Sequence, residues 1–110
     1  MFAVIYRGFV NRGCEKQYIL NWTKVANYFV QSRGALGSTL HKTEDGMWVA
    51  YSKWPSKEVR DNSWPQENQP INSEIPQEIC EAILIMKDCL DKEKQLPEIC
   101  MNVVETIIAN

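Results

Sequence analysis

Two runs of alternating side chains, residues 38–44 and 47–54, are joined by Asp45-Gly46 and constrain the fold more than any other feature of the sequence. An Asp-Gly pair between strands is a strong hairpin signal, because a two-residue type I′ turn needs positive φ at both positions. Such a turn places His41 opposite Ala50. The sequence therefore predicts an antiparallel hairpin with this register.

The predicted register sorts the side chains of the hairpin onto two faces of the sheet, because the side-chain period of a strand is two. One face would carry Leu40, Met47, Val49 and Tyr51, which suit packing against a helix. The other would carry small polar residues between aromatic rings and a histidine, namely Thr39, His41, Thr43, Trp48, Ala50, Ser52 and Trp54. Such a mixture is typical of a cavity wall, so we expect the second face to line a small-molecule cavity.

The remaining elements follow from hydrophobic periodicity. Residues 2–10 are apolar on both faces and predict a buried strand. Apolar residues at helical spacing predict a helix over 14–31, whose inward stripe is Tyr18, Trp22, Val25, Ala26 and Phe29. A short helix over 57–62, a long helix over 76–94 and a last strand over 99–108 are also predicted. Residues 64–72 hold two prolines and no period, which predicts a loop that acts as a lid.

The element order is therefore β-α-β-β-α-α-β over a single domain, residues 1–110. This order predicts an α+β, ferredoxin-like fold, in which an antiparallel four-stranded sheet carries its helices on one face. The opposite face would be too apolar to leave in water. A chain of 110 residues also has little core to spare for an enclosed pocket. Both arguments predict a homodimer in which the two sheets meet.

Composition excludes several classes of function. The net charge of -2 argues against nucleic acid as a partner. The chain has no leader-like start and no run near the roughly 18 apolar residues of a membrane span, so we expect a cytoplasmic protein with no membrane partner. The four cysteines form no Cys-x-x-Cys pair and His41 is the only histidine, so we expect reduced thiols and no metal site.

Three short motifs point to a known family. They are the turn at residues 34–40, the Asp45-Gly46 hairpin, and residues 54–58, in which a strand-ending Trp precedes Pro-Ser-Lys-Glu. Together with residues 6–10 and Gly13, this pattern resembles the antibiotic biosynthesis monooxygenase (ABM) superfamily over roughly residues 2–60. The resemblance implies a dimeric α/β barrel whose cavity binds a planar aromatic molecule. In the enzymatic members it implies oxygenation of polycyclic phenols without a cofactor, with the substrate anion donating an electron to dioxygen.

Haem-cleaving members of the same superfamily have an Asn on the first strand, a Trp in the cavity and an axial His on a later helix. In this sequence Asn11 lies at the far end of the first strand, and there is no histidine after His41. The residues therefore argue against haem cleavage, and we expect no cofactor.

The candidate site residues come from the predicted cavity face and the first strand. His41 is the general-base candidate because its unperturbed pKa lies near neutrality, and Trp48 is the second catalytic candidate through its indole N–H. The substrate-binding candidates are Arg7, Tyr6, Tyr51, Trp54 and Trp64. Each has a structural alternative: packing for the aromatic rings, a solvent-facing position for His41, and for Arg7 an ion pair with a carboxylate such as Glu105.

Three hypotheses of function remain open at this point. The first is a cofactor-independent monooxygenase acting on a small aromatic or phenolic substrate. The second is a small-molecule binding protein without catalysis, and the third is a structural dimer whose aromatic face is all interface. A thiol enzyme based on Cys14, at the start of the first predicted helix, is a weaker alternative.

Overall fold

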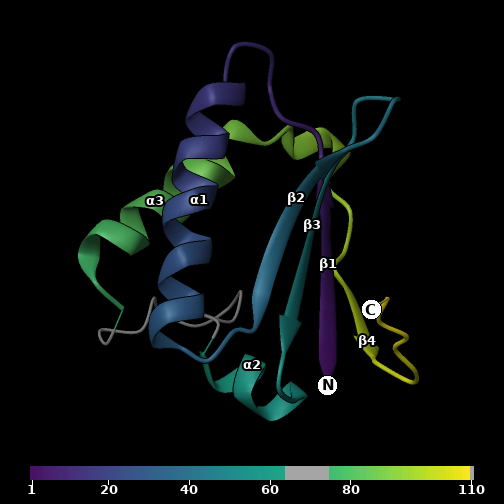
Figure 1. Cartoon of the computed structure of the whole chain (residues 1–110). Coiled ribbons are helices and arrows are strands. Elements are labelled where there is room, and N and C mark those ends of the chain that lie inside the picture. The colour runs from purple at the N-terminus through teal and green to yellow at the C-terminus, as the bar shows by residue number, and fades with distance from the viewer. Residues whose placement is uncertain (64–74, 110) are drawn as a thin grey trace.

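One antiparallel sheet and three helices make up the structure, a computed structural model that describes residues 1–63 and 75–109. The elements are β1 (Phe2–Gly8), α1 (Glu15–Ser32), β2 (Gly37–Lys42), β3 (Trp48–Trp54), α2 (Lys57–Ser63), α3 (Gln77–Cys89), a short 3₁₀ helix (Lys92–Lys94) and β4 (Ile99–Asn102). The sheet order is β2-β3-β1-β4, and Figure 1 shows α1 and α3 together on one face of the sheet. The predicted α+β, ferredoxin-like fold is therefore confirmed.

The predicted register of the hairpin is wrong by one residue. Leu40, not His41, lies opposite Ala50, and His41 lies opposite Val49. The loop has three residues between the pair Thr43 and Met47, whose backbone N–H and carbonyl are 2.8 Å apart. Because side chains alternate along a strand, this shift moves every β2 side chain to the other face of the sheet.

The geometry of the turn explains the shift. Gly46 has φ +91°, whereas no residue other than glycine among those described has positive φ, so Asp45 does not adopt the conformation that a type I′ turn requires. The N–H of Gly46 donates to the carbonyl of Thr43 at 3.0 Å, which closes a four-residue turn. A type I turn followed by a glycine in the left-handed region is the usual three-residue hairpin loop. The hydroxyl of Thr43 also accepts from the N–H of Met47 at 3.0 Å.

Helix α3 ends earlier than predicted, at Cys89 instead of Lys94. Leu90 is extended, with φ -90° and ψ 143°, and forms an isolated bridge with Val10. The next N–H, that of Asp91, donates to the carbonyl of Phe9 at 2.8 Å. The chain therefore leaves the helix to pair with the end of the first strand. The last strand is also shorter than predicted and ends at Asn102 instead of Ile108.

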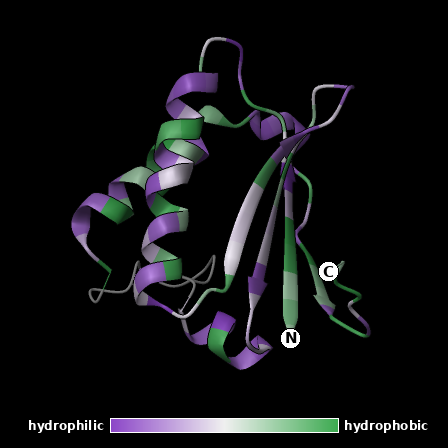
Figure 2. Ribbon diagram, in the orientation of Figure 1, coloured by the Kyte–Doolittle hydropathy of each residue, from purple (hydrophilic) through white to green (hydrophobic). Residues whose placement is uncertain are grey.

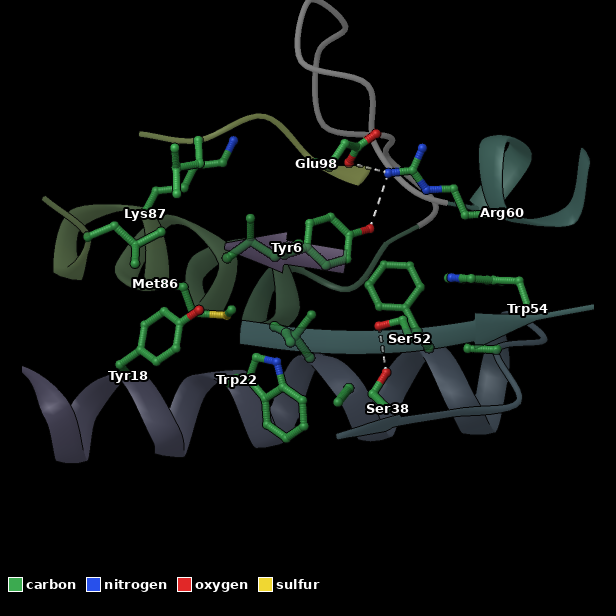
Figure 3. A pocket seen from close by; sticks show the side chains of 18 of the residues that line it. Tyr6, Tyr18, Trp22, Ser38, Ser52, Trp54, Arg60, Met86, Lys87 and Glu98 are labelled. Atoms are coloured by element: carbon green, nitrogen blue, oxygen red, sulfur yellow. Dashed lines mark hydrogen bonds and ion pairs between the residues drawn. The ribbon is translucent and has the colours of Figure 1, made fainter. Parts of the chain in front are cut away.

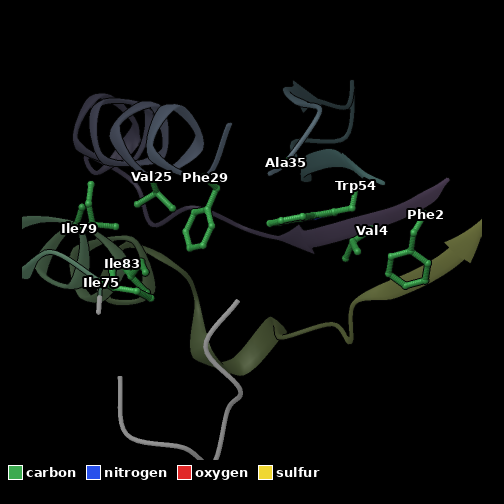
Figure 4. Close-up of a cluster of buried hydrophobic side chains, with 10 residues drawn as sticks. Phe2, Val4, Val25, Phe29, Ala35, Trp54, Ile75, Ile79 and Ile83 are labelled. Atoms are coloured by element: carbon green, nitrogen blue, oxygen red, sulfur yellow. The ribbon is translucent and has the colours of Figure 1, made fainter. Parts of the chain in front are cut away.

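The core lies between the sheet and the two long helices (Figure 4). Val4 and Trp54 are its largest fully buried side chains, and Phe29 of α1 meets Trp54 edge to face at 6.2 Å between ring centroids. Figure 2 shows that hydrophobic residues run through β1 and continue into the segment after β4. The strand residues of this core are Phe2 and Val4 of β1 and Trp54 of β3, and these are the two central strands of the sheet.

Candidate functional site

A cavity of about 510 Å³ lies between the helix-facing side of the sheet and helices α1 and α3. All five residues of the inward stripe that the sequence predicted on α1, from Tyr18 to Phe29, line this cavity. Sheet residues Tyr6, Ser38, Ala50, Ser52 and Trp54 form the facing wall, and α3 contributes Ile83 and Met86. Most of the walls are apolar, so the cavity suits a largely apolar ligand.

A buried guanidinium provides the main charge of the cavity. The Arg60 side chain is only 5% exposed. Its Nη2 donates to the Tyr6 hydroxyl at 3.1 Å and to Oε2 of Glu98 at 2.6 Å, and its Nη1 donates to Asp61 at 3.3 Å (Figure 3). Burial alone would lower the pKa of Arg60, but the hydrogen bonds to Tyr6 and Glu98 and their charges raise it overall. Arg60 therefore carries a permanent positive charge at the cavity wall.

The two cavity tyrosines remain protonated over the physiological pH range. Burial raises the pKa of Tyr6 to about 12, although Arg60 opposes this shift. Burial, with a smaller contribution from Cys89, raises the pKa of Tyr18 to about 12. Both phenols are therefore neutral groups that can donate a hydrogen bond.

The predicted catalytic pair is not brought together in this cavity. His41 is exposed on the face of the sheet opposite the helices, whereas Trp48 is half-buried on the helix-facing side, against the ring of Tyr18 at 5.7 Å. Both residues instead line a shallower groove at the edge strand β2, together with Trp22. The expectation that His41 shares a cavity-lining face with Trp48 is wrong, because it depended on the predicted register.

The predicted binding residues divide between the two faces of the sheet. Tyr6 and Trp54 line the cavity, whereas Arg7 and Tyr51 point to the opposite face, as the pairing of β1 with β3 requires. Arg7 donates from Nη2 to the carbonyl of Pro97 at 3.0 Å and makes no described ion pair with Glu105. Trp64 and the predicted lid at residues 64–72 lie outside the described residues, so both stay predictions.

Sequence reasoning missed five polar residues of the cavity: Tyr18, Ser38, Arg60, Lys87 and Glu98. Tyr18 was recognised as inward-facing but was interpreted as core. Arg60 lies in a short helix whose position over the cavity depends on tertiary structure. Glu98 follows Pro97 in a segment without regular structure, and no sequence signal identifies it.

Two further properties concern the part of the chain that the structure describes. Within residues 1–63 and 75–109 no group of three or more His, Cys, Asp or Glu side chains could hold a metal ion, and the four cysteines are free thiols. Among these same residues, no helix is both long enough and apolar enough to cross a membrane.

Comparison with known proteins gives structural likeness only. No family model matches this sequence, and no curated protein matches it. Among solved structures, an antibiotic biosynthesis monooxygenase aligns with a TM-score of 0.69 at 14% identity, covering 96% of this chain and 100% of that one. SnoaB, a cofactor-independent oxygenase from Streptomyces nogalater, aligns with a TM-score of 0.69 at 13% identity over 96% of this chain and 95% of that one.

A third solved structure, Rv0793 from Mycobacterium tuberculosis, aligns with a TM-score of 0.67 at 12% identity, covering 96% of each chain. These likenesses span nearly the whole length of this chain and of each neighbour. Identities this low establish a common fold and leave the chemistry open. The resemblance drawn from the sequence motifs is thus confirmed at the level of the fold: this chain has the ferredoxin-like α+β fold of the antibiotic biosynthesis monooxygenases.

Proposed function

We propose that the cavity binds a flat phenolic molecule and oxygenates it with dioxygen, without a cofactor. The observation that carries this proposal is the Arg60 guanidinium, buried at the wall of an otherwise largely apolar cavity. A positive charge in such surroundings stabilises a phenolate, and a phenolate is electron-rich enough to pass an electron to dioxygen. The solved structures with this fold include a protein named as a cofactor-independent oxygenase, which supports the proposal.

The proposed reaction converts a phenol and dioxygen into a quinone and water. One oxygen atom becomes the second quinone oxygen, and the other leaves as water with the two hydrogens that the phenol loses. Glu98 lines the cavity, is 39% exposed, and provides a carboxylate that can pass the phenolic proton to solvent. Arg60 holds the resulting oxyanion, and the apolar walls keep water from the reacting carbon.

The first prediction concerns Arg60. The variant Arg60→Gln is expected to lower kcat/KM for oxygen uptake with a panel of naphthols by about 100-fold, because removal of one charge-stabilising donor typically costs that much. Arg60→Lys should recover part of this loss, since it keeps the charge without the planar fork. The measurement is oxygen consumption together with incorporation of isotopically labelled oxygen into the quinone.

Arg12→Gln provides the matched control, because Arg12 is exposed and lies outside the cavity lining. Thermal unfolding of each variant separates loss of activity from loss of the fold. Equal activity of Arg60→Gln and the wild type would remove Arg60 from the reaction.

Binding without catalysis is the second candidate function. Glu98, the carboxylate among the described lining residues, is already bonded to Arg60 at 2.6 Å, and His41 does not line the cavity. These observations leave the cavity without a free, well-placed base, because Glu98 is already paired with Arg60. Naphthols that bind tightly but consume no oxygen would favour this function over the first.

We further propose that a second copy of the chain covers the sheet face opposite the helices. This face presents Ile5, Tyr51 and the 37% exposed Ile99. After β4 the chain exposes Val104 by 94%, Ile107 by 92% and Ile108 by 80%. Exposed apolar residues on a sheet face and in the segment that follows it are typical of an interface.

The dimer gives the second prediction. The double variant Ile107→Glu, Ile108→Glu is expected to be monomeric where the wild type is dimeric, because four charges would have to enter the interface of each dimer. Size-exclusion chromatography with light scattering measures the mass. Leu20→Glu, at a 60% exposed position on α1, is the control and should remain dimeric. A monomeric wild type at all concentrations would contradict the proposal.

A further inference from the structure

Two of the four cysteines meet where the two long helices come together. Cys14 is the residue immediately before α1, and Cys89 is the last residue of α3, 75 positions further along the chain. Figure 1 shows the start of α1 and the end of α3 at the same end of the molecule. Both cysteines are free thiols in the structure, and neither lines the cavity. The fold therefore brings together two nucleophilic side chains that the function proposed above does not use.

Backbone hydrogen bonds hold the two cysteines in place through a shared neighbour, Asn11. The N–H of Asn11 donates to the carbonyl of Cys89 at 2.7 Å, and the N–H of Cys14 donates to the carbonyl of Asn11 at 3.0 Å. The isolated bridge between Val10 and Leu90 extends the same junction by one residue on each side. The position of Cys14 relative to Cys89 is therefore fixed by the pairing of these two segments.

The two thiols also interact directly. Burial raises the pKa of the Cys89 thiol, and a hydrogen bond to the Cys14 side chain and the charge of that side chain raise it further. Tyr18 lies one turn after Cys14, because its N–H donates to the Cys14 carbonyl at 2.8 Å. The charge of Cys89 adds to the effect of burial in raising the pKa of Tyr18, so Cys89 faces this first turn of α1. Side chains that point toward each other in this way are what a disulfide requires.

The two sulfurs differ in their access to solvent. Cys89 is 3% exposed, whereas Cys14 is partly exposed. An oxidant in solution therefore reaches the sulfur of Cys14 first. A sulfenic acid formed on one cysteine condenses with a neighbouring thiol to give a disulfide, and the buried Cys89 is that neighbour.

We propose that Cys14 and Cys89 are a redox-active pair, which hydrogen peroxide converts into a reversible disulfide between the start of α1 and the end of α3. In the first step the sulfur of Cys14 attacks one peroxide oxygen. The S–O bond forms as the O–O bond breaks, and the second oxygen leaves as water with the thiol proton. In the second step the sulfur of Cys89 attacks the sulfur of Cys14, and the hydroxyl leaves as water with the proton of Cys89.

The balance of this reaction needs no other reactant. The two thiols together lose two electrons and two protons, and one peroxide molecule gains them to become two molecules of water. A dithiol reductant reverses the change by exchange with the disulfide. The proposal is independent of the ligand of the cavity, because neither thiol is among the residues that line it.

The disulfide would fasten one end of the cavity. Tyr18 and Leu90 both line the cavity, and they lie one turn after Cys14 and directly after Cys89. A bond between residues 75 positions apart also restricts the unfolded chain strongly. We therefore expect the oxidised protein to unfold at a temperature about 10 °C higher than the reduced protein.

Peroxide treatment of the reduced, dilute, whole protein tests the pair. A maleimide then labels the remaining thiols, and mass spectrometry of the digest identifies the joined peptides. The wild type should keep two of its four reactive thiols and give one peptide pair, joined through Cys14 and Cys89. Dithiothreitol should restore all four thiols and remove the rise in unfolding temperature. In Cys89→Ala the reaction should stop at a sulfenic acid on Cys14, which dimedone traps.

Cys80→Ser and Cys100→Ser are the matched controls, and both should form the disulfide at the wild-type rate. The thiol of Cys80 donates to the carbonyl of Ile75 at 3.7 Å, and that of Cys100 donates to Oε1 of Glu98 at 3.6 Å. Cys100 is exposed, so it would react first if exposure alone decided oxidation.

Three results would overturn the inference. The first is four reactive thiols after peroxide treatment of the wild type, and the second is a disulfide that includes Cys80 or Cys100. The third is a disulfide between Cys14 and Cys89 that leaves the unfolding temperature unchanged, since that bond would not fasten α1 to α3. The first two readouts use the wild type alone, so they decide the proposal even if Cys89→Ala fails to fold.

Discussion

Trp54→Ala is expected to lower the free energy of unfolding by about 3–5 kcal/mol, the usual cost of truncating a fully buried tryptophan. Trp54 is 2% exposed and packs against Phe29 with ring centroids 6.2 Å apart. Its indole nitrogen is buried with no acceptor among the described residues, so the loss is one of packing and not of a hydrogen bond. Urea unfolding followed by far-ultraviolet circular dichroism measures the change.

Trp48→Ala serves as the comparison because Trp48 is on the same strand and the same face but is only half-buried. Its expected cost is smaller, since less apolar area is lost from the folded state. The assignment of Trp54 to the core would be contradicted if the two variants were destabilised equally.

Alkaline pH is expected to destabilise the protein through its cavity tyrosines. The pKa values of Tyr6 and Tyr18 are raised from 10.0 to about 12, so the folded state binds more protons than the unfolded state between these values. The stabilisation that these two tyrosines contribute is therefore fully present below pH 10 and is lost as the pH rises through about 12. Each tyrosine accounts for about 3 kcal/mol, because one pKa unit corresponds to about 1.4 kcal/mol.

Urea unfolding at a series of alkaline pH values measures this loss, and ultraviolet absorption at the same pH values follows phenolate formation. Tyr18→Phe should remove about half of the pH dependence, whereas Tyr28→Phe should leave it unchanged. If all four tyrosines titrated near pH 10, the claim that burial raises the pKa of Tyr6 and Tyr18 would be refuted.

Local patterns identified most of the fold. The stripe from Tyr18 to Phe29 predicted α1 and its inward face, and the structure shows that this face lines the cavity. This prediction succeeded because a helix presents one continuous face, so an error of a residue at either end does not change which side chains point inward. The ends of α3 and β4 were harder to predict because they depend on pairing with distant segments, as Leu90 does with Val10.

The site was harder to predict because the face of a strand depends on its register. Asp45-Gly46 correctly indicated a hairpin, but a three-residue loop and a two-residue loop differ by one position in pairing. That single position separated His41 from the face of Trp48. A prediction of site residues on β2 was therefore only as reliable as the prediction of one turn.

The sequence by itself determined the order of the elements, the inward face of α1 and the class of fold, because these depend on periodicity and turn chemistry within short segments. Only the tertiary structure decided which polar groups share the cavity. Arg60, Tyr6 and Glu98 are separated by 38 to 92 positions along the chain, and their meeting at 2.6–3.1 Å depends on how α2 and the segment before β4 fold over the sheet. Contacts over such separations leave no periodic signal in the sequence, whereas burial of the guanidinium requires its partners to be there.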